Sequence, residues 1–313
     1  MTSYRHVLRK WHNNGDTMQN DTKRMNHLTG KEWVQWSKSI WRFSEPVKDN
    51  YGHPAIFPDF VAERLIRIYT RQGQMILDPM VGTGTTVAVA KGLNRNAIGI
   101  ELSEHWAKIA DNRLTKEYKP YTITDEDRSL NKWVEINKES NKNGQQEYIF
   151  PNICADTHKI ICDDARNLLD HIKPDSIDFC LTSPPYWVGL HGVNGKYTGQ
   201  TQKKYKQYSE SEYDLGNIQN YESFISSLIS IYEKILIVLK PGGYFACIVQ
   251  DSRRGSKVYP IHIDLYNRLS ETGFEYQDVI IWEHPLYTTR PLGYPSTFVI
   301  SRIHDYIMTF RKI

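Results

Sequence analysis

Short apolar runs alternate with amphipathic stretches along most of the chain. Residues 59–71 show the amphipathic type, because Phe60, Leu65 and Ile68 fall on one side of a helix and charged residues on the other. The runs that predict strands are 74–78, 97–101, 159–163, 176–181, 244–250, 276–282 and 304–310, and the stretches that predict helices are 59–71, 82–93 after a glycine turn, 104–117, 221–239 and 261–272. Strands that alternate with helices over short connections favour an α/β fold with a mostly parallel central sheet and helices on both faces.

Polar segments interrupt this alternation and define the organisation that we expect. Residues 118–155 form an insertion rich in Asn, Lys and Glu, so the chain divides into 1–117, the insertion, and 156–313. A second polar segment, rich in Gly and Tyr, covers 188–220. In parallel sheets, ligands bind beyond the carboxyl ends of the strands, and the two motifs described below fall at such ends.

The composition narrows the class of protein. No run of about 18 apolar residues occurs, which argues against a transmembrane helix, and the polar residues 1–20 argue against a secretory signal. The four cysteines lack CxxC spacing, so we expect no metal site or disulfide framework and a reducing, cytoplasmic location. A net charge of +3 allows a nucleic-acid partner without requiring one. Three tryptophans at a spacing of three to five residues favour packing through a helix: Trp33, Trp36 and Trp41.

A glycine-rich turn follows the first predicted strand and opens a helix. Residues 78–86 are Asp-Pro-Met-Val-Gly-Thr-Gly-Thr-Thr, in which Gly82 and Gly84 let the backbone approach a ligand closely. A P-loop is excluded because no lysine follows the glycines, and Val87 stands where a dinucleotide fingerprint has its third glycine. For the glycines alone, a generic turn is an equally good interpretation.

Two acidic residues at the next strand ends sharpen the interpretation. Glu101 ends one predicted strand and can accept hydrogen bonds from both hydroxyls of a ribose. Asp164 follows the next strand and is placed to meet an adenine amino group. No basic cluster at the turn calls for a pyrophosphate. The pattern therefore predicts an adenosine ligand without phosphates, of which S-adenosylmethionine is the commonest cofactor.

A second motif, Thr-Ser-Pro-Pro-Tyr-Trp at 182–187, ends another apolar strand. The two prolines have a fixed φ and no N–H, so the neighbouring carbonyls face outward as acceptors. Ser183 Oγ and the Pro184 carbonyl can accept the two protons of a planar amino group, and Tyr186 can stack on its ring. Such hydrogen bonds localise the nitrogen lone pair and make the nitrogen a nucleophile toward a methyl sulfonium. A strand-ending turn with a packed tyrosine is the alternative for this motif taken alone.

Over about residues 52–118 and 158–312 the chain resembles the amino-group DNA methyltransferases. The segments that carry the resemblance are HPAIFP (53–58), DPMVGTGTT (78–86), AIGIE (97–101), 103–114, CDDAR (162–166), TSPPYW (182–187), LKPGG (239–243) and RIHDYIMTFRK (302–312). The SPPY form resembles the N4-cytosine enzymes, whereas DPPY is more typical of N6-adenine enzymes. The cofactor motif precedes the catalytic motif here, the reverse of the order in many N4-cytosine enzymes.

The resemblance implies a Rossmann-like class I methyltransferase fold with target-recognition insertions near 188–220 and 285–300. It implies S-adenosylmethionine as cofactor, bound by Phe57, Pro58, Asp78, Pro79, Gly82, Gly84, Thr85, Thr86, Glu101, Leu102, Asp164 and Ala165. The expected catalytic residues are Ser183, Pro184, Pro185 and Tyr186.

The partner implied by the resemblance is double-stranded DNA, from which the target base is flipped. Tyr186 and Trp187 would stack on the flipped base. Phosphate contacts would come from two basic segments: 196–208, in which cations and aromatic residues alternate, and 253–257. The expected DNA-binding residues are Trp187, Lys196, Lys203, Lys204, Lys206, Arg253, Arg254 and Lys257. A solvated charged loop is the alternative for each segment.

The leading hypothesis is a site-specific DNA methyltransferase acting on cytosine N4, within a restriction-modification system and alongside a cognate endonuclease. N6-adenine methylation is the alternative within the same chemistry. Methylation of an RNA base and a non-catalytic DNA-binding module are two further alternatives.

Overall fold

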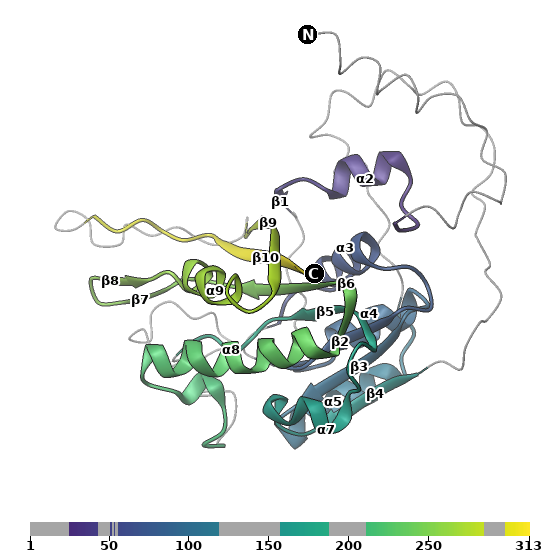
Figure 1. The fold of residues 1–313 in the computed structure, drawn as a ribbon, viewed down its shortest axis with the longest axis horizontal. Helices are drawn as coiled ribbons and strands as arrows, with labels where there is room; N and C mark the ends of the chain where they lie inside the picture. The colour runs from purple at the N-terminus through teal and green to yellow at the C-terminus, as the bar shows by residue number, and fades with distance from the viewer. Residues whose placement is uncertain are drawn as a thin grey trace, which may run out of the picture.

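The computed structural model describes residues 25–42, 51, 53, 56–118, 157–187, 211–284 and 298–313. These residues form an eight-stranded sheet with helices around it (Figure 1). The strands of this sheet are β1 (Ile40–Arg42), β2 (Met75–Asp78), β3 (Asn96–Glu101), β4 (His158–Cys162), β5 (Ile177–Thr182), β6 (Leu239–Val249), β9 (Phe274–Glu283) and β10 (His304–Lys312). A separate hairpin joins β7 (Ser252–Arg254) to β8 (Lys257–Tyr259). The helices are α2 (Gly30–Trp36), α3 (Asp59–Tyr69), α4 (Thr85–Gly92), α5 (Glu104–Leu114), α7 (Leu168–His171), α8 (Tyr221–Val238) and α9 (Ile261–Leu269), with 3-10 turns η3 (Ala165–Asn167) and η5 (Leu215–Asn217).

The strand order is β1-β9-β10-β6-β5-β2-β3-β4. Neighbouring strands from β4 to β6 run parallel, and β10 is antiparallel to both of its neighbours, β6 and β9. Strand β1 then pairs in parallel with the end of β9. The expectation of a mostly parallel sheet is therefore confirmed.

Two apolar clusters lie on opposite faces of this sheet. One cluster packs α7, α8 and α9 against the sheet through residues such as Leu168, Phe224 and Leu265. The other cluster joins α2, α3 and α4 to the sheet through residues such as Trp36, Leu65 and Val87. In Figure 1, α8 lies on the opposite side of the strands from α2 and α3. Helices on both faces were predicted from the alternating pattern, and this prediction is also confirmed.

The predicted boundary between the helix at 221–239 and its following strand is wrong. Strand β6 begins at Leu239, directly after α8, and runs through Pro241, Gly242 and Gly243. The pairing of β6 with β5 is irregular here, because the step from Ile177 to Phe179 in β5 is matched by a longer step from Leu239 to Tyr244 in β6. Gly242 has φ +78°, a conformation that glycine adopts without strain. The Pro-Gly-Gly segment therefore lies in an irregular stretch of the strand and does not precede it.

The tryptophan cluster is only partly helical. Trp33 and Trp36 lie on α2, whereas Trp41 lies on β1 and is almost fully buried. The guanidinium of Arg64 on α3 lies 4.8 Å from the centre of the Trp41 ring and 5.5 Å from that of Trp36. Through these contacts both α2 and β1 pack against α3. The tryptophans were expected to pack through a helix, and the structure shows that a strand contributes as well.

The predicted insertions fall largely outside the described residues. Within 118–155 the structure describes only Tyr118, within 188–220 only 211–220, and within 285–300 only 298–300. The division into 1–117, 118–155 and 156–313 therefore stays a prediction. The described parts position the carboxyl edge of the sheet, where the motifs lie.

Candidate active site

A pocket opens at the carboxyl edge of the sheet, where β2, β3 and β5 end. Its empty volume is about 900 Å³, including the part open to solvent, which lies in the range of small-molecule sites. The residues predicted from sequence that line it are Phe57, Pro79, Gly82, Thr85, Glu101, Leu102, Asp164, Ala165, Ser183, Pro184 and Pro185. Predicted residues that do not line it are Pro58, Asp78, Gly84, Thr86 and Tyr186. The cofactor motif and the catalytic motif thus meet at one pocket.

Asp78 ends β2 and lies almost fully buried beneath the glycine turn. Its carboxylate accepts a hydrogen bond from Thr86 Oγ1 at 2.5 Å and one from the Met80 N–H at 3.2 Å. Burial raises the pKa of Asp78 to about 6, although these hydrogen bonds lower it. Asp78 therefore holds the turn in shape from below and does not face the pocket itself.

The turn above Asp78 requires its glycines. Gly82 and Gly84 have φ values of +55° and +86°, and the Gly84 N–H donates to the Val81 carbonyl at 2.9 Å. A Cβ on Gly84 would lie 3.0 Å from Ala110 on α5, closer than ordinary contacts. The close approach of α5 and the positive φ both explain why glycine stands here, where α4 begins.

Glu101 ends β3 and places its carboxylate in the pocket wall. Its two oxygens each accept one backbone hydrogen bond at 2.9 Å, from the N–H groups of Gly82 and Ser103. Burial raises the pKa of Glu101 to about 7, against the lowering effect of these two N–H groups. A carboxylate has about four acceptor positions. Two therefore remain, which matches the two hydroxyls of a ribose.

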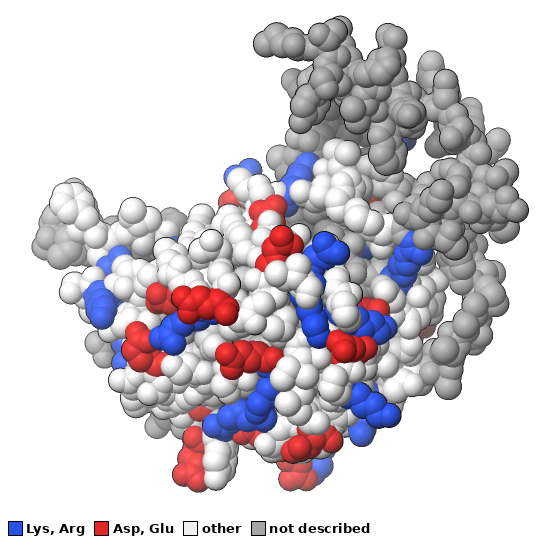
Figure 2. Space-filling model, viewed as in Figure 1, with Lys and Arg blue, Asp and Glu red and all other residues white. Residues whose placement is uncertain are grey.

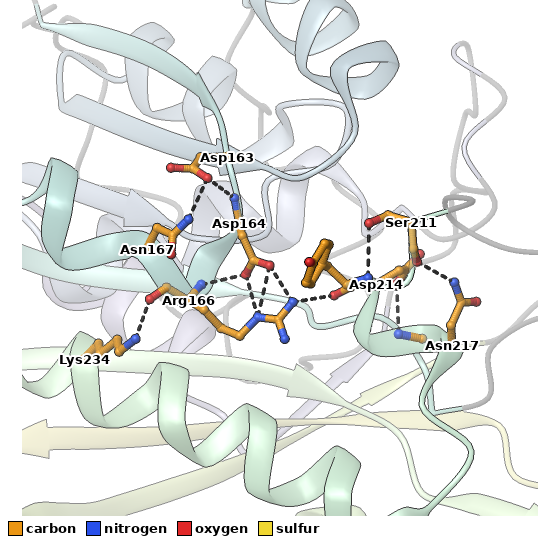
Figure 3. Close-up of polar contacts among 10 residues, drawn as sticks. Asp163, Asp164, Arg166, Asn167, Ser211, Asp214, Asn217 and Lys234 are labelled. Carbon is orange, nitrogen blue, oxygen red and sulfur yellow. Dashed lines mark hydrogen bonds and ion pairs between the residues drawn. The ribbon is translucent and has the colours of Figure 1, made fainter.

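Asp164 follows β4 and is held by Arg166 (Figure 3). The Arg166 backbone N–H and Nε donate to Oδ1, while Nε and Nη2 donate to Oδ2, at 2.5–3.0 Å. Because Nε is shared between the two oxygens, only three donors occupy the roughly four acceptor positions of the carboxylate, and about one position remains. Arg166 also donates to the Tyr213 carbonyl at 2.9 Å and lies 5.4 Å from the centre of the Tyr213 ring.

Arg166 thereby holds residues 211–217, a segment of the pocket wall that was not predicted from the sequence. In this segment Tyr213, Asp214 and Leu215 line the pocket. Asp214 is buried and caps η5 by accepting the Gly216 N–H at 2.9 Å. Ser211, Asp214 and Asn217 hold one another by short-range hydrogen bonds (Figure 3). The sequence offered one clue, an aspartate that stands two residues before a glycine and seven residues before a predicted helix.

His53 and Trp106 are two further lining residues absent from the predicted site set. Their rings lie 4.6 Å apart in an edge-on arrangement. His53 belongs to the segment that resembles the family's pre-strand motif, so a signal for it existed. Trp106 lies on α5, whose amphipathic pattern indicated only a packed face.

The catalytic motif continues β5 into an irregular loop. Ser183, Pro184 and Pro185 line the pocket, and Ser183 Oγ donates a long hydrogen bond of 3.4 Å to the Ile248 carbonyl. Tyr186 follows them, partly buried, without lining the pocket. The motif thus brings Ser183 and the two prolines to the same pocket as Glu101.

The residues expected to bind DNA lie in three different environments. Trp187 is only 5% exposed and packs in the apolar core, and its role in stacking on the flipped base stays a prediction. Arg253, Arg254 and Lys257 lie on the β7–β8 hairpin, directly after the carboxyl end of β6. The other expected contacts, Lys196, Lys203, Lys204 and Lys206, lie outside the described residues.

The charge of the pocket distinguishes between ligand classes. Its described lining carries three carboxylates, Glu101, Asp164 and Asp214, and no lysine or arginine. Such a lining disfavours a phosphorylated nucleotide and suits a ligand that carries positive charge. An adenosine joined to a sulfonium and an amino group has this charge and no phosphate. The residues present therefore fit S-adenosylmethionine.

The fold and the pocket together define a Rossmann-like methyltransferase. Its features are the mostly parallel sheet with one antiparallel strand, a glycine turn and a strand-end glutamate at one edge, and a Ser-Pro-Pro loop beside them. The sequence model of the DNA methylase family, in its N6/N4 branch, matches residues 4–112 and 177–313. The chain therefore belongs to this family, which confirms the resemblance and the prediction of S-adenosylmethionine as cofactor.

Individual relatives match shorter stretches. Type II methyltransferase M.HpaI of Haemophilus parainfluenzae is 28% identical over 159 residues, 45% of this chain and 50% of that protein. M.BglI of Bacillus subtilis is 35% identical over 94 residues, 30% of this chain and 27% of that protein. M2.DpnII of Streptococcus pneumoniae is 48% identical over 65 residues, 21% of this chain and 24% of that protein. The chain thus spans half or less of the length of these relatives.

Solved structures also match. A putative DNA modification methylase of Thermus thermophilus, in complex with S-adenosyl-L-methionine, is 28% identical, with a TM-score of 0.34 over 48% of this chain and 53% of that one. An rRNA methylase of Streptococcus thermophilus is 13% identical, with a TM-score of 0.43 over 83% of this chain and 98% of that one. In the part of the chain that the structure describes, no helix is long and apolar enough to cross a membrane, and no side-chain cluster suits a metal ion.

Proposed function

We propose that this chain transfers the methyl group of S-adenosylmethionine to the exocyclic N4 amino group of cytosine in double-stranded DNA. The observation that carries the proposal is the meeting of two motifs at one pocket. Ser183 and Pro184 line the same pocket as Glu101, so an amino group held by the first two lies beside a cofactor held by the third. Membership of the DNA methylase family supports DNA as the substrate.

Different pocket residues are assigned to different parts of the cofactor. Glu101 offers two acceptor positions to the ribose, and Asp164 with Ala165 borders the adenine end. Phe57 and Thr85 border the remaining part of the pocket, to which we assign the methionine end. When bound there, S-adenosylmethionine supplies a methyl group on a sulfonium, and the sulfur retains the electron pair of the bond that breaks.

The Ser-Pro-Pro-Tyr loop acts on the target amino group. Ser183 Oγ and the Pro184 carbonyl accept its two N–H bonds, which directs the nitrogen lone pair toward the methyl carbon. Tyr186 stacks on the flipped base, whose extrusion from the duplex costs a few kcal/mol. The methylated nitrogen is cationic and loses one proton to water or through Ser183. Catalysis then rests on orientation and hydrogen bonding, without a covalent enzyme intermediate.

The choice of base rests on the serine at position 183. A serine hydroxyl before the two prolines is the form that resembles N4-cytosine enzymes. N6-adenine is the alternative, because the family includes both activities in its name.

The DNA is proposed to lie along the carboxyl edge, over the β7–β8 hairpin. Arg253 on this hairpin would contact phosphates, together with Lys196, Lys203, Lys204 and Lys206, which follow the Ser-Pro-Pro-Tyr loop in the sequence. Several relatives are named type II methyltransferases, and one, M.BamHII of Bacillus amyloliquefaciens, is named an orphan methyltransferase. The name type II methyltransferase supports a role in a restriction-modification system with a cognate endonuclease. If that endonuclease still digested the methylated DNA, this role would be contradicted.

The test is product identification. The purified protein is incubated with S-adenosylmethionine and mixed-sequence duplex DNA, and the nucleosides are analysed by mass spectrometry. N4-methylcytosine is the expected product, and N6-methyladenine would overturn the base assignment while retaining the mechanism. Methylation of RNA alone, or no methylation at all, would overturn DNA methylation itself. S183A should abolish transfer and retain cofactor binding, whereas S226A, at an exposed position on α8, should retain both.

A further inference from the structure

The residue that directly follows the catalytic loop belongs to a compact aromatic cluster. Trp187 packs against Tyr221, at the start of α8, and Tyr259, at the end of β8, with ring centres 4.9 and 4.6 Å apart. The rings of Tyr221 and Tyr259 are 4.8 Å from each other, so the three rings form a closed triangle. Tyr221 also donates a short hydrogen bond to Asp264 on α9. The loop after β5 therefore ends on a cluster fixed to two helices.

The β7–β8 hairpin covers this cluster with a cation. The guanidinium of Arg254 lies 4.2 Å from the centre of the Trp187 ring. Lys257, its cross-strand partner in the hairpin, places its ammonium 4.6 Å from the Tyr259 ring. The two cations of the hairpin thus cover the aromatic triangle. Trp187, which is only 5% exposed, lies between the apolar core and the guanidinium of Arg254.

Arg253 has a different environment on the same hairpin. Successive residues of a strand point to opposite faces, so Arg253 faces away from the side of Arg254. Its only described hydrogen bond is a long one of 3.4 Å to the Ser256 carbonyl, at the exposed turn. Figure 2 shows Lys and Arg side chains at the end of the molecule where Figure 1 draws this hairpin. Adjacent arginines therefore offer a test of two different roles.

The base of the hairpin is tied to the sheet edge. Asp251, just before β7, accepts a hydrogen bond from His262 Nδ1 at 2.6 Å, and Arg302 donates to its backbone carbonyl. The His262 ring stacks on Tyr306 of β10, with ring centres 3.8 Å apart. The hairpin is thus anchored to α9 and β10, and Arg254 approaches Trp187 from a fixed support.

We propose that Arg254 is a positioning residue that holds the catalytic loop through Trp187, and that it does not bind DNA phosphate. The inference rests on the proposed methyl transfer, because it concerns the loop Ser183–Tyr186. Strand β5 fixes the first end of this loop, and Trp187 fixes the second. Pro184 and Pro185 stiffen the part between them, so the place of Trp187 sets the place of Tyr186, the residue before it. A displacement of about 1 Å at such a loop costs as much as about 100-fold in rate.

The size of the effect follows from the contact that is lost. A cation above a tryptophan ring contributes about 1–2 kcal/mol when partly desolvated. That contribution corresponds to about a 5-fold to 30-fold change in the population of the positioned loop. R254A should therefore lower the single-turnover rate constant at saturating DNA by this factor. R254K retains a cation over the ring and should recover a large part of the rate.

The experiment compares three arginines on the same protein. R254A and R254K are measured beside R253A, and R268A serves as the matched control, since Arg268 on α9 is exposed and pairs only with Glu222 among the described residues. Each variant is assayed for the single-turnover rate constant, the KM for DNA, and the slope of log Kd against log salt concentration. R254A should change the rate constant and keep the wild-type salt slope. R253A should reduce that slope by about one, as the loss of a phosphate contact does, and R268A should change neither quantity.

A spectroscopic readout is independent of methylation. In protein labelled with 5-fluorotryptophan, the fluorine resonance that disappears in W187F is that of residue 187. R254A should shift this resonance, and the midpoint of its thermal unfolding should stay close to that of wild type. If R254A instead lowers the salt slope and leaves the rate constant and the resonance unchanged, Arg254 is a phosphate contact and the inference is overturned. A wild-type protein without any methylation would refute the proposed function, whereas a shifted resonance would still place Arg254 on Trp187.

Discussion

The replacement of Glu101 by glutamine tests the centre of the proposed cofactor site. The change keeps the size of the side chain and removes its charge. In the native pocket the two carboxylate oxygens accept the N–H groups of Gly82 and Ser103, each at 2.9 Å. A glutamine has one acceptor oxygen and one NH₂ group, so one of these backbone donors meets another donor. The ribose also loses a charged acceptor.

The expected magnitude follows from these two losses. A hydrogen bond to a charged group contributes about 1.5–3 kcal/mol, so we expect E101Q to raise the Kd for S-adenosylmethionine about 10-fold to 100-fold. The pKa adds a second signature. Because burial raises the pKa of Glu101 to about 7, the carboxyl gains a proton as the pH falls below that value, and the ionised acceptor is lost. Wild-type affinity should therefore fall by up to about tenfold per pH unit on the acid side, and E101Q should lose that dependence.

Isothermal titration calorimetry from about pH 6.5 to 8.5, on either side of the Glu101 pKa, measures both signatures. The control is E104Q, since Glu104 lies only three positions along the chain, is exposed, and pairs with Lys108. E104Q should bind the cofactor as wild type does at every pH. An E101Q variant with wild-type affinity and wild-type pH dependence would refute the assignment of Glu101 to the ribose.

Three further changes give separate tests. G84A should destabilise the protein by about 1–3 kcal/mol in chemical denaturation, because φ is +86° and the new Cβ would lie 3.0 Å from Ala110; unchanged stability would show that α5 can move away. Burial raises the pKa of Asp78 to about 6, so the unfolded chain loses that proton first as the pH rises from about 4 to 6. Wild type should lose up to about 3 kcal/mol of unfolding free energy over this range relative to D78N, and parallel pH profiles for the two proteins would contradict the buried carboxyl. R166M should weaken cofactor binding by leaving Asp164 without its ion pair and the 211–217 wall without its tie; wild-type affinity would show that neither contact shapes the pocket.

The sequence predicted those parts of the site in which the end of a strand and the polar or glycine residues of the site lie in one short segment. The glycine turn and the Ser183 loop follow β2 and β5, and Glu101 is the last residue of β3; these strands have four to six residues. Because parallel strands bring their carboxyl ends to one edge, placing these strands was enough to place the chemistry. The period of the hydrophobic pattern carried this information.

The parts that the sequence did not predict depend on pairs of residues that are distant in the chain. Arg166 meets Tyr213, 47 positions later, and no local pattern links them. Strands β1, β7 and β8 have only three residues each, too few for a period to be detected. Trp187 was expected to stack on the flipped base, and its packing against the rings of Tyr221 and Tyr259, which are distant in the chain, could not be read from the motif.

The pairing of β1 with β9 has a consequence for biosynthesis. Arg42 and Glu283 face each other across this pair and form an ion pair, although 241 positions separate them in the chain. At about 5–20 residues per second, the ribosome makes β9 about 10 to 50 seconds after β1. During this interval Trp41 lacks its neighbour in the sheet, Trp282 of β9, while the glycine turn and β2 to β5 can already assemble. Among the strands that the structure describes, the first to leave the ribosome is thus one of the last to join the sheet.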